Sequence, residues 1–327
     1  MKVSIIAPMY NEEAVIVNSI DRFVKTFARL KDTWELILVN DGSTDETLRL
    51  ANEESKKYPN IKVLSYMPNR GRGRALRTGF AHAEGDFIVT TEADSSWGEE
   101  IIIRLLAELK KNEADIVVAS PHRKGGGYKN VPFHRRFLSS VGNKVLGLSF
   151  GRNLTMTTGM TRGYRREIID SLNLECDGKE IHLEIISKAL ALGAKIEEIP
   201  AVLEWKKEKR GKPERKSSFK AGRLIITHLL FSFNESPLLL VGTIGAGFLV
   251  IGSVIGIVML YQYLIGTLEI VRPLIIIMVV SLIIGMQVLL FYFIATQNKY
   301  VQKQLIRIQS DILKIKRKSL NKNKDAR

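Results

Sequence analysis

The sequence predicts an α/β fold with a mostly parallel sheet flanked by helices, followed by an interfacial amphipathic helix and a two-helix transmembrane hairpin. Strand and helix patterns alternate between residues 3 and 119, and their connections are short. Two long apolar stretches, 238–268 and 274–297, carry no formal charge. The chain therefore divides into an α/β part and a membrane part.

The elements of the α/β part differ in the period of their apolar residues. Strands show alternating or uninterrupted apolar residues, whereas helices repeat them every three to four positions. Strands are predicted at 3–9, 34–40, 61–67, 87–91 and 115–119, and helices at 14–30, 45–58, 73–84, 99–111 and 180–192. Alternation of strand and helix requires crossover connections, which favour a parallel sheet covered by helices.

The apolar stretches predict a transmembrane hairpin over 237–297, with spans at about 238–264 and 273–296, since roughly 20 apolar residues cross a bilayer. A buried helix pair in a soluble protein is the alternative. The preceding segment, 217–236, mixes basic and apolar residues, as amphipathic helices in the membrane interface do. The domains are then 1–216, 217–236, 237–297 and a basic tail, 298–327.

The net charge of +15 lies in two segments beside the apolar stretches. Nine basic and two acidic residues lie in 206–223, and ten basic and two acidic residues lie in 299–327. Basic flanks favour the cytoplasmic side and anionic lipid headgroups as partners. We expect a multi-pass protein of the cell membrane with two spans, with the first domain and both termini cytoplasmic. The remaining charges balance, which argues against nucleic-acid binding.

Polar motifs follow four predicted strands, at Pro8–Glu13, Asn40–Asp45, Asn69–Ala75 and Glu92–Asp94. In open parallel sheets, ligands bind beyond the carboxyl ends of the strands. An aspartate in a tight turn accepts hydrogen bonds, a glycine-rich helix start suits a pyrophosphate, and an acid-x-acid pair can hold a divalent cation. Each motif alone is typical of a turn or a solvated helix start, but the four together favour a binding site.

These motifs resemble those of family 2 glycosyltransferases, and most of all the polyprenyl-phosphate branch of the family. The matching segments are Pro-x-Tyr-Asn-Glu-Glu, Asp-Gly-Ser-Thr-Asp, Asn-Arg-Gly-x-Gly-x-Ala-Leu-Arg-Thr-Gly and the acid-x-acid pair. The resemblance implies a GT-A fold for residues 1–216, a nucleotide-sugar donor of the GDP-mannose or UDP-glucose type, and Mg2+ or Mn2+ as cofactor. It also implies inversion at the sugar carbon.

The resemblance assigns the donor site residue by residue. It places Glu92 and Asp94 at the metal, although the family usually has aspartate at the first of these positions, and Asn40 replaces a frequent aspartate. Glutamate still offers oxygen ligands to a hard cation. The residues implied to bind the nucleotide sugar are Pro8, Tyr10, Glu12, Asp41, Gly71, Gly73, Glu92 and Asp94.

The resemblance also implies a phosphate site for the acceptor, because Arg-Arg-Phe-Leu-Ser at 135–139 is similar to a family segment that faces it. Arginine forks pair bidentately with phosphate oxygens, although a solvated basic face is the alternative for Arg135 and its neighbour. The implied acceptor-phosphate residues are Arg123, Arg135, Ser139 and Lys212. The implied catalytic set is Asp94, Arg123, Arg135, Ser139, Arg162, Glu184 and Arg210.

Together these features predict transfer of a single hexose from a nucleotide sugar to a polyprenyl (dolichyl) phosphate. The acceptor phosphate is already an anion at neutral pH, so the reaction needs no dedicated general base. A catalytically silent membrane-anchored protein that binds sugar nucleotides or lipids is one alternative. A glycosyltransferase acting on another lipid or polysaccharide acceptor is the other, and a homo-oligomer is left open.

Overall fold

The computed structural model describes residues 1–94, 96–111, 113–133, 136, 139–140, 143, 154–204, 242–267 and 272–325, with only the backbone described for 272, 314 and 316–325. These residues fall into two compact units, one built from within 1–217 and 305–325 and the other from within 218–304. The first is an α/β unit and the second is a pair of helices.

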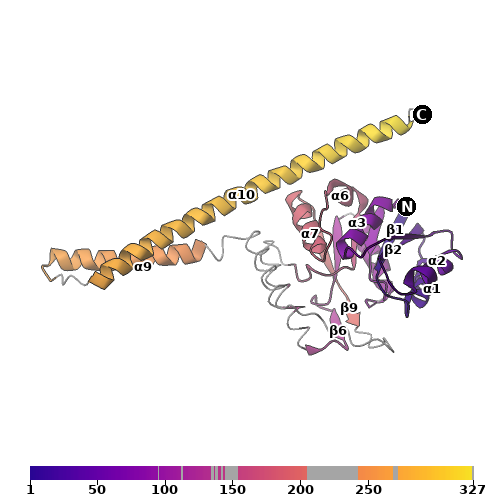
Figure 1. The fold of residues 1–327 in the computed structure, drawn as a ribbon, viewed down its shortest axis with the longest axis horizontal. Coiled ribbons are helices and arrows are strands. Elements are labelled where there is room, and N and C mark those ends of the chain that lie inside the picture. Colours follow the sequence, from indigo (N-terminus) through magenta and orange to yellow (C-terminus); the bar gives the residue numbers. More distant parts are fainter. Residues whose placement is uncertain are drawn as a thin grey trace. The chain divides into compact units, whose positions relative to one another are not determined.

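The α/β unit, which carries the labels β1 to α7 in Figure 1, contains a mixed sheet of strands. The sheet has seven strands in the order β3-β2-β1-β4-β7-β5-β8. Its strands are β1 (Lys2–Met9), β2 (Thr33–Asp41), β3 (Ile61–Tyr66), β4 (Phe87–Thr90), β5 (Ile116–Ser120), β7 (Arg162–Arg165) and β8 (Ile196–Pro200). Every pairing is parallel except those of β7 with β4 and β5. The predicted mostly parallel sheet is confirmed, and the carboxyl ends of β1, β2, β4 and β5 lie at one end of it.

The helices pack on this sheet through their apolar faces. They are α1 (Ile16–Phe27), α2 (Thr47–Ser55), α3 (Arg72–His82), α4 (Glu100–Lys110), α6 (Arg166–Ser171) and α7 (Ile181–Ala191). Helix α3 packs on β1 and β2, whereas α4 packs on β4, β5 and β7. Helix α1 begins two residues later than predicted, because the Glu12 carbonyl accepts hydrogen bonds from the amides of Val15 and Ile16 in a turn.

The core lies in the central strands, which are buried on both faces. Ile5 and Ile6 of β1 are fully buried, as are Leu36–Val39 of β2. All five residues of β5 are buried as well. Burial on both faces explains why these strands show uninterrupted apolar runs in the sequence, since parallel sheets are covered by helices on both sides.

A second, two-stranded sheet supports the loop that follows β4. It pairs β6 (Gly127–Lys129) with β9 (Val202–Glu204) in parallel. The Glu204 amide at its end donates a hydrogen bond of 2.8 Å to the Ser96 carbonyl. The chain after β8 therefore holds the loop that carries Glu92 and Asp94.

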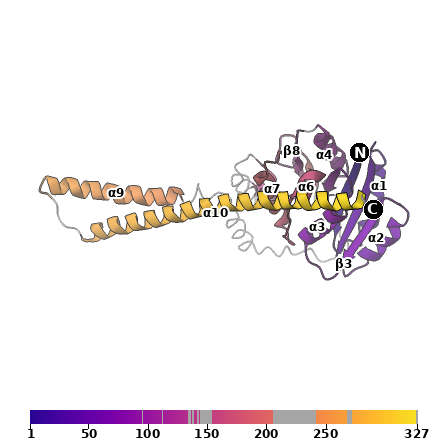
Figure 2. The same cartoon turned by 90° about the horizontal axis from the view of Figure 1, so that it is seen from above.

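The helical unit contains α9 (Thr243–Leu264) and the first part of α10 (Arg272–Asp325), which lie side by side (Figure 2). Glycines allow the two helices to approach closely. A Cβ atom on Gly252 would lie 2.8 Å from Leu282, and one on Gly285 would lie 2.7 Å from Leu249. Both helices are long and apolar enough to cross a membrane. The predicted hairpin thus has the helices that it requires.

Helix α10 continues beyond the predicted end of the second span at about residue 296 and reaches Asp325. The sequence from 297 to 325 contains neither proline nor glycine, so nothing in it interrupts the helix. The basic tail is therefore helical where the structure describes it. The predicted interfacial helix, 217–236, lies outside the described residues.

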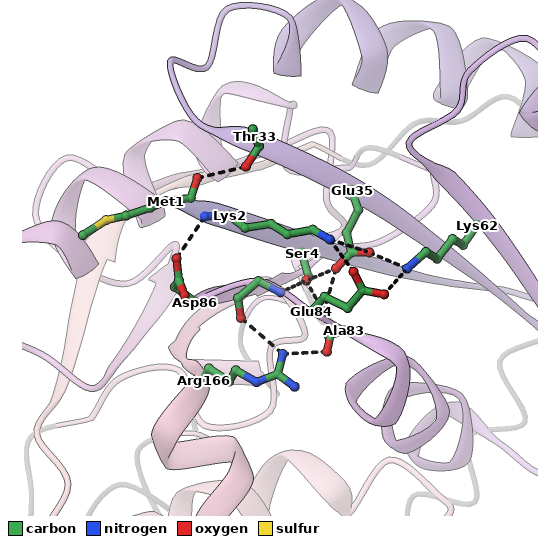
Figure 3. Close-up of polar contacts among 11 residues, drawn as sticks. Met1, Lys2, Ser4, Thr33, Glu35, Lys62, Ala83, Glu84, Asp86 and Arg166 are labelled. Carbon is green, nitrogen blue, oxygen red and sulfur yellow. Dashed lines mark hydrogen bonds and ion pairs between the residues drawn. The ribbon is translucent and has the colours of Figure 1, made fainter. Parts of the chain in front are cut away.

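Charged side chains gather at the opposite end of the sheet, at the start of β1 and β2 (Figure 3). Glu35 is buried, accepts a 2.6 Å hydrogen bond from the Ser4 hydroxyl and pairs with Lys62 Nζ at 2.9 Å. The Glu84 amide donates to the same carboxylate at 2.7 Å. Burial alone would raise the pKa of Glu35, but these bonds lower it below its ordinary value. The network joins β1, β2 and β3 to the end of α3.

Glu35→Gln is expected to lower the free energy of unfolding at pH 7 by about 2 kcal/mol, the range for hydrogen bonds to charged groups. The folded-state pKa of Glu35 is lowered, so its contribution is complete above the unfolded-state pKa and is lost as the pH falls through the folded-state value. Thermal unfolding of the full chain in detergent between pH 7 and pH 3 should show that the stability difference between wild type and Glu35→Gln becomes smaller as the pH falls. Glu84→Gln, at an exposed side chain, is the control and should cost less. A difference independent of pH would contradict this account.

Candidate active site

The loops after β1 and β2 are joined by hydrogen bonds. Asn11, in a left-handed conformation with φ 53°, accepts a bond of 2.9 Å from the Thr44 amide through Oδ1. The Asn11 amide donates to Ser43 Oγ at 3.0 Å, and the Glu12 amide donates to Thr47 Oγ1 at 2.7 Å. The structure therefore brings the predicted Tyr10–Glu12 and Asp41 segments together at one end of the sheet.

Asp41 lies at the end of β2 and is nearly buried. Its carboxylate accepts hydrogen bonds from Tyr66 Oη at 2.8 Å, from Asn69 Nδ2 at 2.9 Å, and from the amides of Arg70 and Gly71 at 2.9 and 3.0 Å. Burial and the Asp41 charge raise the pKa of Tyr66. Asp41 therefore fixes the loop that leads into α3, and a nucleobase bound at this carboxylate would share it with these donors.

The start of α3 packs against a loop from a distant part of the sequence. A Cβ atom on Gly71, whose φ is 104°, would lie 2.7 Å from the Asp177 carbonyl, and one on Gly73 would lie 2.4 Å from the Cys176 carbonyl. The Arg74 amide donates to the Asp177 carbonyl at 3.1 Å. The two glycines predicted to face a pyrophosphate thus allow this loop to approach α3.

Asp177 also neutralises two of the arginines at this helix start. Its carboxylate pairs with Arg70 Nη2 at 3.1 Å and with Arg77 Nη1 at 2.8 Å. Glu184 of α7 holds the loop from the other side, because it accepts hydrogen bonds of 2.9 Å from the amides of Glu175 and Cys176. Glu184, which was predicted to be catalytic, therefore orders the loop beside α3.

Glu92 and Asp94 follow β4, and both contact Ser96. The Ser96 hydroxyl donates to Glu92 Oε2, and the Ser96 amide donates to Asp94 Oδ1 at 3.0 Å. Burial raises the pKa of Glu92, and the negative charge of Asp94 raises it further. The positive charge of Arg72, at the start of α3, acts in the opposite direction. The pair thus concentrates negative charge beside the α3 loop.

This pair fits a divalent cation. Two carboxylates separated by one residue offer oxygen ligands to a hard cation, and a cation beside them would offset both the burial of Glu92 and its repulsion by Asp94, which raise its pKa. The described part of the chain contains no group of three or more His, Cys, Asp or Glu residues that could hold an ion. A bound Mg2+ or Mn2+ would therefore complete its coordination with substrate phosphate oxygens and water.

Arg123 and Glu198 form an ion pair at the end of β5 and β8. Arg123 Nε lies 3.1 Å from Glu198 Oε2, and the arginine side chain is 44% exposed whereas that of the glutamate is fully buried. Glu198 also accepts bonds from the amides of Thr155 and Met156, at 2.8 and 2.7 Å. The predicted phosphate-binding arginine therefore has a fixed partner.

Ser139 is held by two hydrogen-bond donors. Its Oγ accepts from Asn143 Nδ2 at 3.3 Å and from Tyr128 Oη at 3.5 Å. Asn143 is oriented in turn, since its Oδ1 accepts from the amide of Thr157 at 2.8 Å. With two donors on its oxygen, the Ser139 hydroxyl has its own proton left to donate, as an acceptor phosphate would require.

Arg162 begins β7 and is fully buried. Its guanidinium donates to the backbone carbonyls of His182 at 3.0 Å and Thr157 at 2.5 Å. The catalytic role predicted for Arg162 would require this buried side chain to leave the core. Three other predicted residues, Arg135, Arg210 and Lys212, lie outside the described residues.

Two residues important to the site were not among those predicted. Asp177 gave no sequence signal, because its partners Arg70 and Arg77 lie 107 and 100 positions earlier in the chain. Glu198 lies in the middle of β8, and its partner Arg123 comes from the loop after β5. No local motif connects these two residues in the sequence.

The mostly parallel sheet, with its motifs at one end, defines a GT-A type α/β fold. The model of the family "Glycosyl transferase family 2" matches residues 4–172, and the chain belongs to this family. The resemblance found in the sequence is thereby confirmed.

Two curated relatives and one solved structure show how far the similarity extends. The chain is 33% identical to the dolichol-phosphate mannosyltransferase of Pyrococcus furiosus over 61% of its own length and 56% of the relative's. It is 29% identical to the undecaprenyl-phosphate 4-deoxy-4-formamido-L-arabinose transferase of Proteus mirabilis, over 81% and 77%. Glucosyl-3-phosphoglycerate synthase from Mycobacterium tuberculosis, crystallised with Mn2+, UDP and glucosyl-3-phosphoglycerate, is 21% identical with a TM-score of 0.51, over 71% and 79%. This last similarity shows the fold alone.

Proposed function

We propose that the protein transfers one hexose from a nucleotide sugar to a polyprenyl phosphate at a membrane surface. The observation that carries this proposal is the combination, in one chain, of a glycosyltransferase family 2 fold with two helices long enough to cross a membrane. Relatives named for dolichol phosphate and undecaprenyl phosphate support the acceptor class. The basic segments 206–223 and 299–327 support a cytoplasmic position of the catalytic unit, near anionic headgroups.

In the proposed reaction, the residues bind and position two anionic substrates. The loops that hold Tyr10, Glu12 and Asp41 bind the nucleoside. Glu92 and Asp94 would hold Mg2+ or Mn2+, which when bound would offset charge on the departing nucleoside diphosphate. Arg123 and Ser139 bind the acceptor phosphate. The phosphate oxygen attacks the sugar carbon directly, so one displacement inverts that carbon without a general base.

A catalytically silent binding protein is the second candidate, favoured by the unusual glutamate at position 92. One screen separates the two. Full-length protein is incubated with Mn2+, radiolabelled UDP or GDP sugars and either dolichyl or undecaprenyl phosphate. Label from one donor should appear in an organic-soluble product and disappear when EDTA is present. Tight donor binding without transfer to either lipid would favour the silent protein.

A further inference from the structure

Glu198 lies in the middle of β8 (Ile196–Pro200), and its side chain is fully buried. A buried carboxylate is stable only when donors or cations surround it. Three donors come from the loop after residue 154: the Thr155 amide and hydroxyl, each at 2.8 Å, and the Met156 amide at 2.7 Å. These bonds fix the position of the carboxylate relative to the backbone.

Among the described residues, this carboxylate also forms an ion pair with Arg123, whose Nε lies 3.1 Å from Glu198 Oε2. An anionic partner beside Nε restrains the planar guanidinium and leaves the terminal Nη1 and Nη2 as a pair of donors. That pair matches two oxygens of a phosphate. Since Arg123 is nearly half exposed, its orientation depends on this buried partner more than on packing.

The loop that Glu198 holds also leads to Ser139. Beyond Met156, the amides of Thr157 and Thr158 donate to Asn143 Oδ1 at 2.8 and 3.3 Å. Asn143 Nδ2 then donates to Ser139 Oγ at 3.3 Å. One buried carboxylate is therefore connected to both described residues that the proposed function places at the acceptor phosphate.

We propose that Glu198 is a positioning residue for the phosphate monoester of the acceptor and that it acts through Arg123. This inference rests on the proposed function, because it takes a lipid phosphate as the acceptor. Glu198 touches neither substrate. Its role is to hold the arginine fork in the orientation that the phosphate requires.

Glu198→Gln separates this role from a structural one. The glutamine carbonyl oxygen can still accept from the Thr155 and Met156 amides, whereas the amide nitrogen in place of the second oxygen cannot accept from Arg123. Thr155→Val is the matched control, because it removes a hydroxyl bonded to the same carboxylate and leaves the arginine pair intact. Both variants should unfold at temperatures near that of the wild type.

The test measures binding of farnesyl phosphate and farnesol to the full chain in detergent by calorimetry. E198Q should weaken farnesyl phosphate binding about tenfold and leave farnesol binding unchanged, whereas Thr155→Val should change either by less than twofold. In an Arg123→Ala background, E198Q should cause no further loss, because residues that act through one another are not additive. An equal loss in both backgrounds would overturn the inference alone. A wild type that binds farnesol as well as farnesyl phosphate would overturn the proposed acceptor, and the inference with it.

The NMR signal of the Arg123 Nε–H group reports the pairing without any ligand. In the wild type this N–H group should be protected from solvent exchange, and in E198Q the protection should be lost. The Arg123→Lys variant lacks the signal and so identifies it. A protected signal in E198Q would overturn the inference. If E198Q does not fold, Glu198→Asp withdraws the carboxylate by one methylene and should lose the same signal, while retained protection and full farnesyl phosphate affinity in that variant would contradict the proposal.

Discussion

Asp94→Asn is expected to lower the rate of sugar transfer by roughly a hundredfold or more, the largest effect of any single substitution in the described site. The loss follows because an amide replaces a negative carboxylate beside the departing diphosphate, and metal-ion stabilisation of that charge amounts to several kcal/mol, each 1.36 kcal/mol being a factor of ten. The product assay with the donor identified by the radiolabel screen measures it, at Mn2+ concentrations from micromolar to millimolar.

Two further variants make the result specific to the metal. Glu92→Asp keeps the acid-x-acid charge and should retain most of the activity, with an altered Mn2+ dependence. Asp86→Asn changes a carboxylate at the other end of the same strand, where it accepts a hydrogen bond from the Lys2 amide at 3.0 Å, and should leave the Mn2+ dependence unchanged. Undiminished transfer by Asp94→Asn at every Mn2+ concentration would refute the metal assignment.

The sequence predicted those parts of the site that consist of residues close together in the chain. Each predicted strand exists, and because parallel strands end together, the motifs after β1, β2 and β4 could be assigned to one end of the sheet. The periodicity of apolar residues decides strand and helix, and it also predicted the long helices of the membrane part.

Contacts between distant segments were not predictable in the same way. Strand β7 is short and has arginines at both ends, so no apolar run marks it, and the sequence predicts a catalytic role for its first residue, Arg162. Its burial follows from its place between β4 and β5, which depends on the whole sheet. The roles of Asp177 and Glu198 likewise depend on tertiary contacts with segments that no spacing rule connects to them.

Gly73→Ala is expected to destabilise the protein by about 2 to 3 kcal/mol and to weaken donor binding, for a reason that lies in one of these distant contacts. The new Cβ would lie 2.4 Å from the Cys176 carbonyl, 2.7 Å from the Gly178 carbonyl and 2.8 Å from the Asp177 carbonyl carbon. All three are backbone atoms, so the loop as a whole must shift away from α3.

That shift would break the hydrogen bond from the Arg74 amide to the Asp177 carbonyl and loosen the Asp177 pairs with Arg70 and Arg77. The start of α3 would then lie differently, including Arg72, whose charge acts on Glu92. The KM for the nucleotide sugar should therefore rise several-fold while farnesyl phosphate binding stays the same. Gly127→Ala is the matched control, because a Cβ there meets nothing within 4 Å. The test is the thermal unfolding of the two variants together with their donor and acceptor affinities. Equal stability of Gly73→Ala and Gly127→Ala would show that the loop moves without cost and that it does not shape the donor site.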